Sequence, residues 1–119
     1  MAATEPQIVT KNMGNGIVIT LLTPQLLEDA EITSLEQAIL QTIKEANIVN
    51  FVLNFENVNF LSSAVLRVLI KINTAVTERN GKLRLCEIAP KILEVFKITR
   101  LNKLFDIRKD VDAAVESLK

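Results

Sequence analysis

Residues 48–55 form a short, almost entirely apolar stretch that is rich in β-branched and aromatic side chains. Such a stretch is typical of a strand that is covered on both faces of a sheet. After a short connection, apolar residues recur at helical spacing over residues 62–79, and Asn80-Gly81 then provides a stop signal. A buried strand followed directly by a long helix is half of a βαβ unit, which favours a parallel sheet packed against helices.

Strand and helix signals continue in both directions from this unit. Residues 7–11 and 17–22 predict two strands, joined by a hairpin turn at residues 13–16. Residues 29–46 predict a helix, although a capping box at residues 33–36 offers a later start. The remaining predicted elements are a strand at residues 82–88, a helix at 90–98, a strand at 104–107 and a last helix capped by Asp110.

The predicted order is β-β-α-β-α-β-α-β-α. This order predicts an α/β fold with a mixed, mostly parallel sheet of four to five strands and four helices. The chain has 119 residues, 49% of them hydrophobic, which is enough to build one core without disulfides or metals. We therefore expect residues 1–119 to form a single domain.

Several kinds of chemistry are excluded by residues that the sequence lacks. It contains no histidine and a single cysteine, Cys86, so a Ser-His triad, most zinc sites and an internal disulfide are ruled out. The three glycines form no phosphate-binding loop. A hydrolase that uses Ser62 or Ser63 would lack a base. We predict a protein that is not an enzyme, with no catalytic residue, no metal and no cofactor.

Charge and hydropathy limit the cellular compartment and the classes of partner that we expect. Fourteen basic and fourteen acidic side chains cancel, which argues against direct nucleic-acid binding. Neither a signal peptide nor an apolar stretch of about 18 residues is present, so we expect a cytoplasmic protein without membrane contact. A local basic cluster predicts a solvated edge, with phosphate or nucleotide contact as a minor alternative; it comprises Lys97, Arg100, Lys103, Arg108 and Lys109.

Two adjacent serines mark the joint between the buried strand and the long helix. Ser62 is predicted to cap the helix with its hydroxyl, which leaves Ser63 in the first turn. A helix N-terminus tolerates negative charge, so a phosphate on Ser63 would change a surface without unfolding the domain. The preceding Val58 and Phe60 are expected to point into the core. The apolar arc of the helix is wide, so either neighbouring helices cover it or its part near Val65 is a docking surface.

Two stretches, "VNFLSSAVLRVLI" and "GKLRLCEIAPKILEVFKITRLNKLFDI", resemble the STAS domain family of anti-anti-sigma factors, or anti-sigma factor antagonists. The second ends in the family's Thr-x-Leu-x-x-Leu-Phe-x-Ile pattern, at Thr99, Leu101, Leu104, Phe105 and Ile107. The resemblance implies partner switching. The antagonist binds an anti-sigma factor that is also a serine kinase, phosphorylation of one serine blocks the binding, and a serine phosphatase restores it.

Ungapped matching to the family places Ser63 on the phosphorylated serine. Ser62, Ala64, Val65 and Arg67 would then form the centre of the partner-binding surface. Val65 stands where the family usually has glycine. This difference motivates an alternative, a non-phosphorylated STAS scaffold subunit of a stress-signalling, transporter or lipid-transport assembly. The sequence leaves a homo-oligomer open, and it names neither the sigma factor nor the kinase.

Overall fold

The first two strands of the sheet form the predicted hairpin. In the computed structural model, which describes residues 7–119, β1 (Ile8–Asn12) pairs antiparallel with β2 (Ile17–Leu21). The turn between them is closed by a hydrogen bond of 2.8 Å from the backbone N–H of Met13 to the carbonyl of Gly16. Gly14 takes a φ of 89°, a conformation that residues with a side chain rarely adopt.

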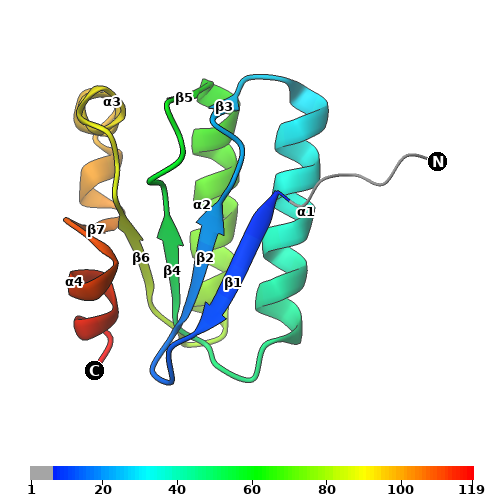
Figure 1. The fold of residues 1–119 in the computed structure, drawn as a ribbon, viewed down its shortest axis with the longest axis vertical. Coiled ribbons are helices and arrows are strands. Elements are labelled where there is room, and N and C mark those ends of the chain that lie inside the picture. The colour runs from blue at the N-terminus through cyan, green and yellow to red at the C-terminus, as the bar shows by residue number, and fades with distance from the viewer. Residues whose placement is uncertain (1–6) are drawn as a thin grey trace.

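The sheet has five strands in the order β1-β2-β4-β6-β7 (Figure 1). The strands after the hairpin are β4 (Phe51–Asn54), β6 (Leu83–Cys86) and β7 (Asp106–Arg108), and each runs parallel to its neighbour on the hairpin side. The prediction of a mixed, mostly parallel sheet is therefore confirmed. A separate ribbon of two short parallel strands, β3 (Gln25–Leu26) and β5 (Phe60–Leu61), was not predicted.

Four helices and one 3-10 turn connect or follow these strands, as the element order predicts. They are α1 (Asp29–Glu45), α2 (Ser63–Glu78), α3 (Pro90–Ile98), η1 (Leu101–Lys103) and α4 (Val111–Glu116). The later start offered for the first helix is wrong, because the backbone N–H of Ile32 already bonds the carbonyl of Glu28 at 3.0 Å. Asp29 and Glu31 lie in the first turn of α1, where negative charge is favourable.

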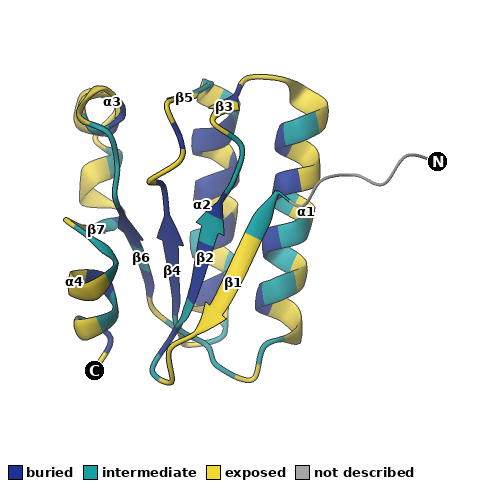
Figure 2. Cartoon of the chain, in the orientation of Figure 1, coloured by how far each residue is buried: buried dark blue, intermediate teal, exposed yellow. Residues whose placement is uncertain are grey.

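The main core lies between one face of the sheet and helices α1, α2 and α3. All four residues of β4 are buried, as expected for the central strand, and Figure 2 shows this strand and the facing sides of α1 and α2 in the colour of buried residues. Phe96 of α3 packs edge to face on Phe105, with 6.1 Å between the ring centroids. Most of the wide apolar arc of α2 is thus covered by neighbouring elements, while Ile70 is 39% exposed.

The other face of the sheet carries a smaller core under α4. Val18, Val52 and Cys86 alternate with main-core residues along their strands, so they face the opposite way and pack against Ala114 and Leu118. Burial raises the pKa of the Cys86 thiol to about 12.

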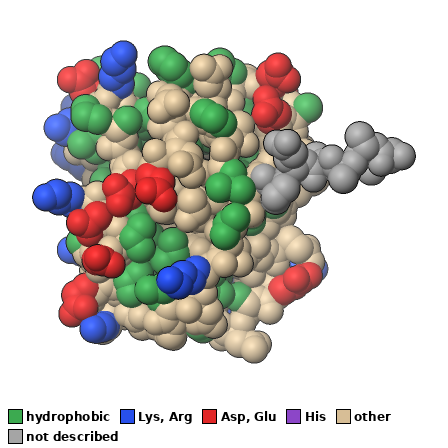
Figure 3. Space-filling model, in the orientation of Figure 1, with side chains coloured by type: hydrophobic (Ala, Val, Ile, Leu, Met, Phe, Trp, Pro, Cys, Tyr) green, Lys and Arg blue, Asp and Glu red, His purple; other side chains and the backbone are tan. Residues whose placement is uncertain are grey.

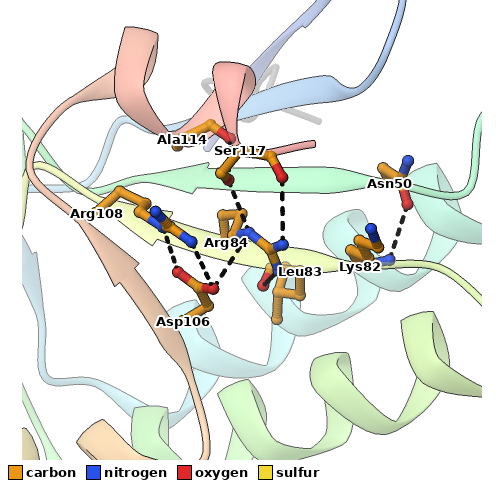
Figure 4. A network of polar contacts seen from close by, with 8 residues as sticks. All are labelled: Asn50, Lys82, Leu83, Arg84, Asp106, Arg108, Ala114 and Ser117. Atoms are coloured by element: carbon orange, nitrogen blue, oxygen red, sulfur yellow. Dashed lines mark hydrogen bonds and ion pairs between the residues drawn. The ribbon is translucent and has the colours of Figure 1, made fainter. Parts of the chain in front are cut away.

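A polar network at the same face ties α4 to the sheet. The guanidinium of Arg84 on β6 donates to the hydroxyl of Ser117 at 2.8 Å and lies 3.5 Å from the carboxylate of Asp106 (Figure 4). Arg108 also donates to Asp106, and this hydrogen bond lowers the pKa of the Asp106 carboxyl. The last helix is therefore held by both apolar and polar contacts.

Candidate functional site

The serine joint lies beyond the end of β4 and is held in place by the β3–β5 ribbon. The backbone N–H of Ser62 donates to the carbonyl of Leu26 at 2.9 Å, and the N–H of Asn59 donates to the carbonyl of Pro24 at 2.7 Å. These bonds fix the entry into α2 at the end of the molecule where β3 and β5 lie in Figure 1. In parallel sheets this carboxyl edge is the usual place for functional sites.

Ser62 occupies the N-cap position of α2 but does not cap it with its side chain. Its backbone is extended, with φ −88° and ψ 167°, as an N-cap requires. Its Oγ makes no bond to the helix, is buried, and has no hydrogen-bond partner. The prediction of a hydroxyl cap is therefore wrong. The backbone carbonyl of Ser62 accepts instead from the N–H of Val65, at 3.0 Å.

Ser63 is exposed and is the first residue of α2. The first turn of this helix contains no acidic residue, so α2 itself supplies no negative side chain at the positive end of its dipole. A negatively charged group on the Ser63 hydroxyl would therefore meet a favourable field. Backbone N–H groups at a helix N-terminus are also good donors to phosphate oxygens.

Val65 lies in the core and not on the surface. Its side chain is 1% exposed and belongs to the main apolar cluster. A docking surface at Val65 is thus not what the structure shows, since this part of the arc is covered by the protein itself. The valine at the position where the resemblance predicts glycine is therefore packed into the core and is not exposed beside Ser63.

Phe60 is half exposed, although the sequence pattern places it in the core. Of the two expected core residues, Val58 is buried and only Phe60 differs. The reason is that β5 pairs with β3 outside the main sheet, so its two side chains do not both face the core. Leu27, which follows β3, is also half exposed. The region around Ser63 therefore contains exposed apolar side chains that the sequence pattern does not indicate.

A shallow groove between α1 and α2 adjoins this region. From α2 it is lined by Ala64, Arg67 and Lys71, and from α1 by Asp29 and Glu36, among others. The ammonium of Lys71 lies 3.6 Å from the carboxylate of Glu36 across the groove. Arg67 is exposed. The contribution of α1 has no signal in the sequence, because it depends on how the two helices pack.

Asn54 and Glu56, which precede the serine joint, satisfy each other locally. The Oδ1 of Asn54 accepts from the backbone N–H of Glu56 at 3.0 Å, and its amide donates to the hydroxyl of Thr20 at 3.2 Å.

Residues 7–119 contain no group of three or more potential metal ligands of the His, Cys, Asp and Glu types. Within the same residues, no helix has the length and apolar character needed to cross a membrane.

Comparison with known proteins identifies the family of this chain. The family model that describes the STAS domain matches residues 15–114. A candidate anti-sigma factor antagonist of Bordetella bronchiseptica, BtrV, is 32% identical over 68 residues, which is 57% of this chain and 59% of BtrV. The aligned part thus spans less than two thirds of that relative.

Solved structures share the fold. An anti-sigma factor antagonist (STAS) domain protein of Planctomyces limnophilus superposes with a TM-score of 0.83 at 18% identity, covering 93% of this chain and 97% of that one. An anti-sigma factor antagonist of Mycobacterium paratuberculosis gives 0.81 at 19% identity, covering 93% and 92%. The phosphorylated form of the Bacillus cell fate determinant SpoIIAA gives 0.69 at 16% identity, covering 94% and 99%. With the family model matching most of its length, the chain belongs to the STAS domain family, the family of the anti-sigma factor antagonists.

Proposed function

We propose that this protein is a cytoplasmic, non-enzymatic anti-sigma factor antagonist that is controlled by phosphorylation of Ser63. The observation that carries the proposal is the exposed Ser63 at the N-terminus of α2, whose first turn contains no acidic residue. The partner is an anti-sigma factor that is also a serine kinase, and a serine phosphatase reverses the modification. The likeness to antagonists such as BtrV supports this assignment.

The partner surface would consist of side chains that are accessible around Ser63. Ala64 is partly buried, Arg67 is exposed, and Phe60 offers half of its ring. Ser62 contributes through its backbone at the edge of this surface, while Val65 supports it from the core. Apolar contacts around a central hydroxyl are typical of a specific protein interface with a dry centre.

A phosphate on Ser63 would act on binding and not on folding. It adds roughly two negative charges and three acceptor oxygens, which an apolar interface cannot bury without a large desolvation cost. The fold tolerates it, since the dipole of α2 favours negative charge and Arg67 lies one helical turn away. The protein can therefore bind the anti-sigma factor or carry a phosphate on Ser63, but not both at once.

The test compares Ser63→Asp with Ser63→Ala in titration calorimetry against the cognate anti-sigma factor. We expect Ser63→Asp to weaken binding by about 100-fold, as for an uncompensated charge placed in an interface, and Ser63→Ala to keep it. Ser34→Asp, at an exposed position on α1, is the matched control for the added charge and should bind as the wild type does. Equal affinities for the two Ser63 variants would refute the switch.

A second experiment distinguishes the switch from the alternative of a permanent scaffold subunit. Incubation with the kinase and ATP, followed by intact mass measurement, should add one phosphate to the wild type and none to Ser63→Ala. A chain that binds its partner but gains no phosphate would be a scaffold.

A further inference from the structure

A second exposed apolar patch lies on α3 and the turn that follows it. Val95 is 38% exposed, Ile98 81% and Leu104 49%. Lys91, Val95 and Ile98 follow each other at spacings of four and three residues, which places them on one side of the helix. The opposite side of α3 is anchored in the core by Ile92 and Phe96. The outward side is therefore apolar without being needed for the core.

Basic side chains surround this patch. Residues 90–104 contain four basic residues and one acidic residue, although the whole chain has a net charge of zero. The four are Lys91, Lys97, Arg100 and Lys103, and all are exposed. Among residues 7–119, the ion pairs involve Lys71, Arg84, Arg108 and Lys119, and none of these four. Figure 3 shows hydrophobic and basic side chains next to each other at the α3 end of the molecule.

The backbone at Arg100 has an uncommon conformation. Arg100 follows α3 with φ 62° and ψ 16°, in the left-handed region. Glycine or asparagine normally holds such a position after a helix, because a larger side chain costs free energy there. The end of α2 follows this rule with Asn80 at φ 62°. Glycine could therefore replace Arg100 without disturbing the local backbone.

We propose that the outward side of α3 and η1 is a second docking surface, for a partner protein segment that carries acidic residues around aliphatic ones. Charge complementarity is the basis, since four cations that form no ion pair within residues 7–119 flank three exposed aliphatic side chains. This surface is formed by a segment between β6 and β7. Ser63 belongs to a different segment, at the start of α2, which follows β5.

A protein segment fits this patch better than a lipid surface does. Membrane-surface helices usually carry aromatic anchors and a purely cationic polar side. No aromatic side chain is exposed on α3, since Phe96 is fully buried, and Glu94 stands among the outward residues. Lys91 and Lys97 lie three residues to either side of Glu94, an arrangement suited to mixed polar contacts.

The test uses a fluorescent, end-capped peptide of roughly 16 residues, long enough to form a helix on binding, with Leu at helical spacing and Glu elsewhere. We expect saturable binding to the full chain that weakens as salt rises. A peptide with Gln in place of every Glu should bind at least about tenfold more weakly. Vesicles of phosphatidylcholine and phosphatidylglycerol form the lipid arm, and we expect no binding to them.

Two variants locate the site. Arg100→Gly relieves the left-handed strain, so it should keep or raise the unfolding midpoint. It should also weaken binding of the peptide about fivefold. Ile98→Ser removes a side chain that is 81% exposed and should weaken the peptide likewise, whereas Val9→Ser, at a 52% exposed position on β1, is the control without effect. Ser63→Asp should bind the peptide as the wild type does, so this proposal can fail or hold independently of the phosphorylation switch.

Three results would overturn the proposal. One is the absence of peptide binding by the wild type. Another is equal binding by the wild type, Arg100→Gly and Ile98→Ser. The third is binding to the anionic vesicles in place of the peptide, which would make the patch a membrane contact.

Discussion

The N-cap positions of α2 and α4 both hold a residue type that commonly caps helices, but only the residue at α4 does so with its side chain. At α4, the carboxylate of Asp110 accepts a hydrogen bond of 2.8 Å from the backbone N–H of Ala113, so the helix is capped by its own side chain. At α2, Ser62 stands in the same position with an extended backbone, yet its hydroxyl makes no such bond. Asp112 adds a further negative charge to the first turn of α4, and α2 has none.

Length and burial explain why the two helices can differ. α4 has six residues and one buried side chain, so its local cap is a large part of what holds it. α2 has sixteen residues, of which six are buried, and it remains folded through packing. A helix that does not need its cap can leave its positive end open to a charge that arrives later. The comparison thus supports a regulatory role for Ser63.

The largest effect is expected from changing the third residue of each helix to glycine. Val65→Gly removes a core side chain and adds backbone freedom in α2, so it should lower the free energy of unfolding by about 3 kcal/mol. Ala113→Gly, at an exposed position in α4, should cost only about 1 kcal/mol. Urea unfolding followed by circular dichroism measures both. Equal losses would contradict the view that packing holds α2.

A smaller effect, different at the two helices, is expected from removing each N-cap side chain. Asp110→Ala should lower the free energy of unfolding by about 1 kcal/mol, because a donor at the start of α4 loses its acceptor. Ser62→Ala should change it by no more than about 0.5 kcal/mol, toward greater stability, because the buried hydroxyl has no partner to lose. Urea midpoints of the two variants give the comparison, and a loss at Ser62 as large as that at Asp110 would remove the distinction.

The elements that the sequence predicts well are those with local signals. The apolar run of β4, the proline that opens α3 and the aspartate that caps α4 each carry their own physical reason, and each was found in place. The element order and the mostly parallel sheet follow from the alternation of these signals. For the same reason Ser63 could be placed at a helix start from the residues alone.

The errors that affect the candidate site concern the serine joint, where tertiary contacts decide the conformation. Phe60 lies outside the core because two residues of β5 pair with β3, a ribbon too short to leave a pattern in the sequence. The orientation of Ser62 depends on the bond from its N–H to Leu26, which comes from a distant segment. Whether Val65 faces a partner or the core depends on how α1 and α2 pack, and periodicity within one helix does not contain that information.

The smallest effect is expected in the reactivity of Cys86, which lies under α4. Its thiol is buried under this helix, and its pKa is raised to about 12, so at pH 8 almost no thiolate exists in the folded protein. When α4 detaches, the thiol regains an ordinary pKa near 8.5 and reacts with a thiol reagent. Asp110→Ala should therefore increase the labelling rate by about fivefold, since its cap is worth about 1 kcal/mol of local stability and its negative charge also helps to raise the pKa of the thiol. Ser62→Ala should leave the rate unchanged, because α2 does not cover Cys86. If the Asp110 variant lost stability in urea without faster labelling, its cap would support the whole fold and not the attachment of α4, and the contrast between the two helix starts would have to be drawn elsewhere.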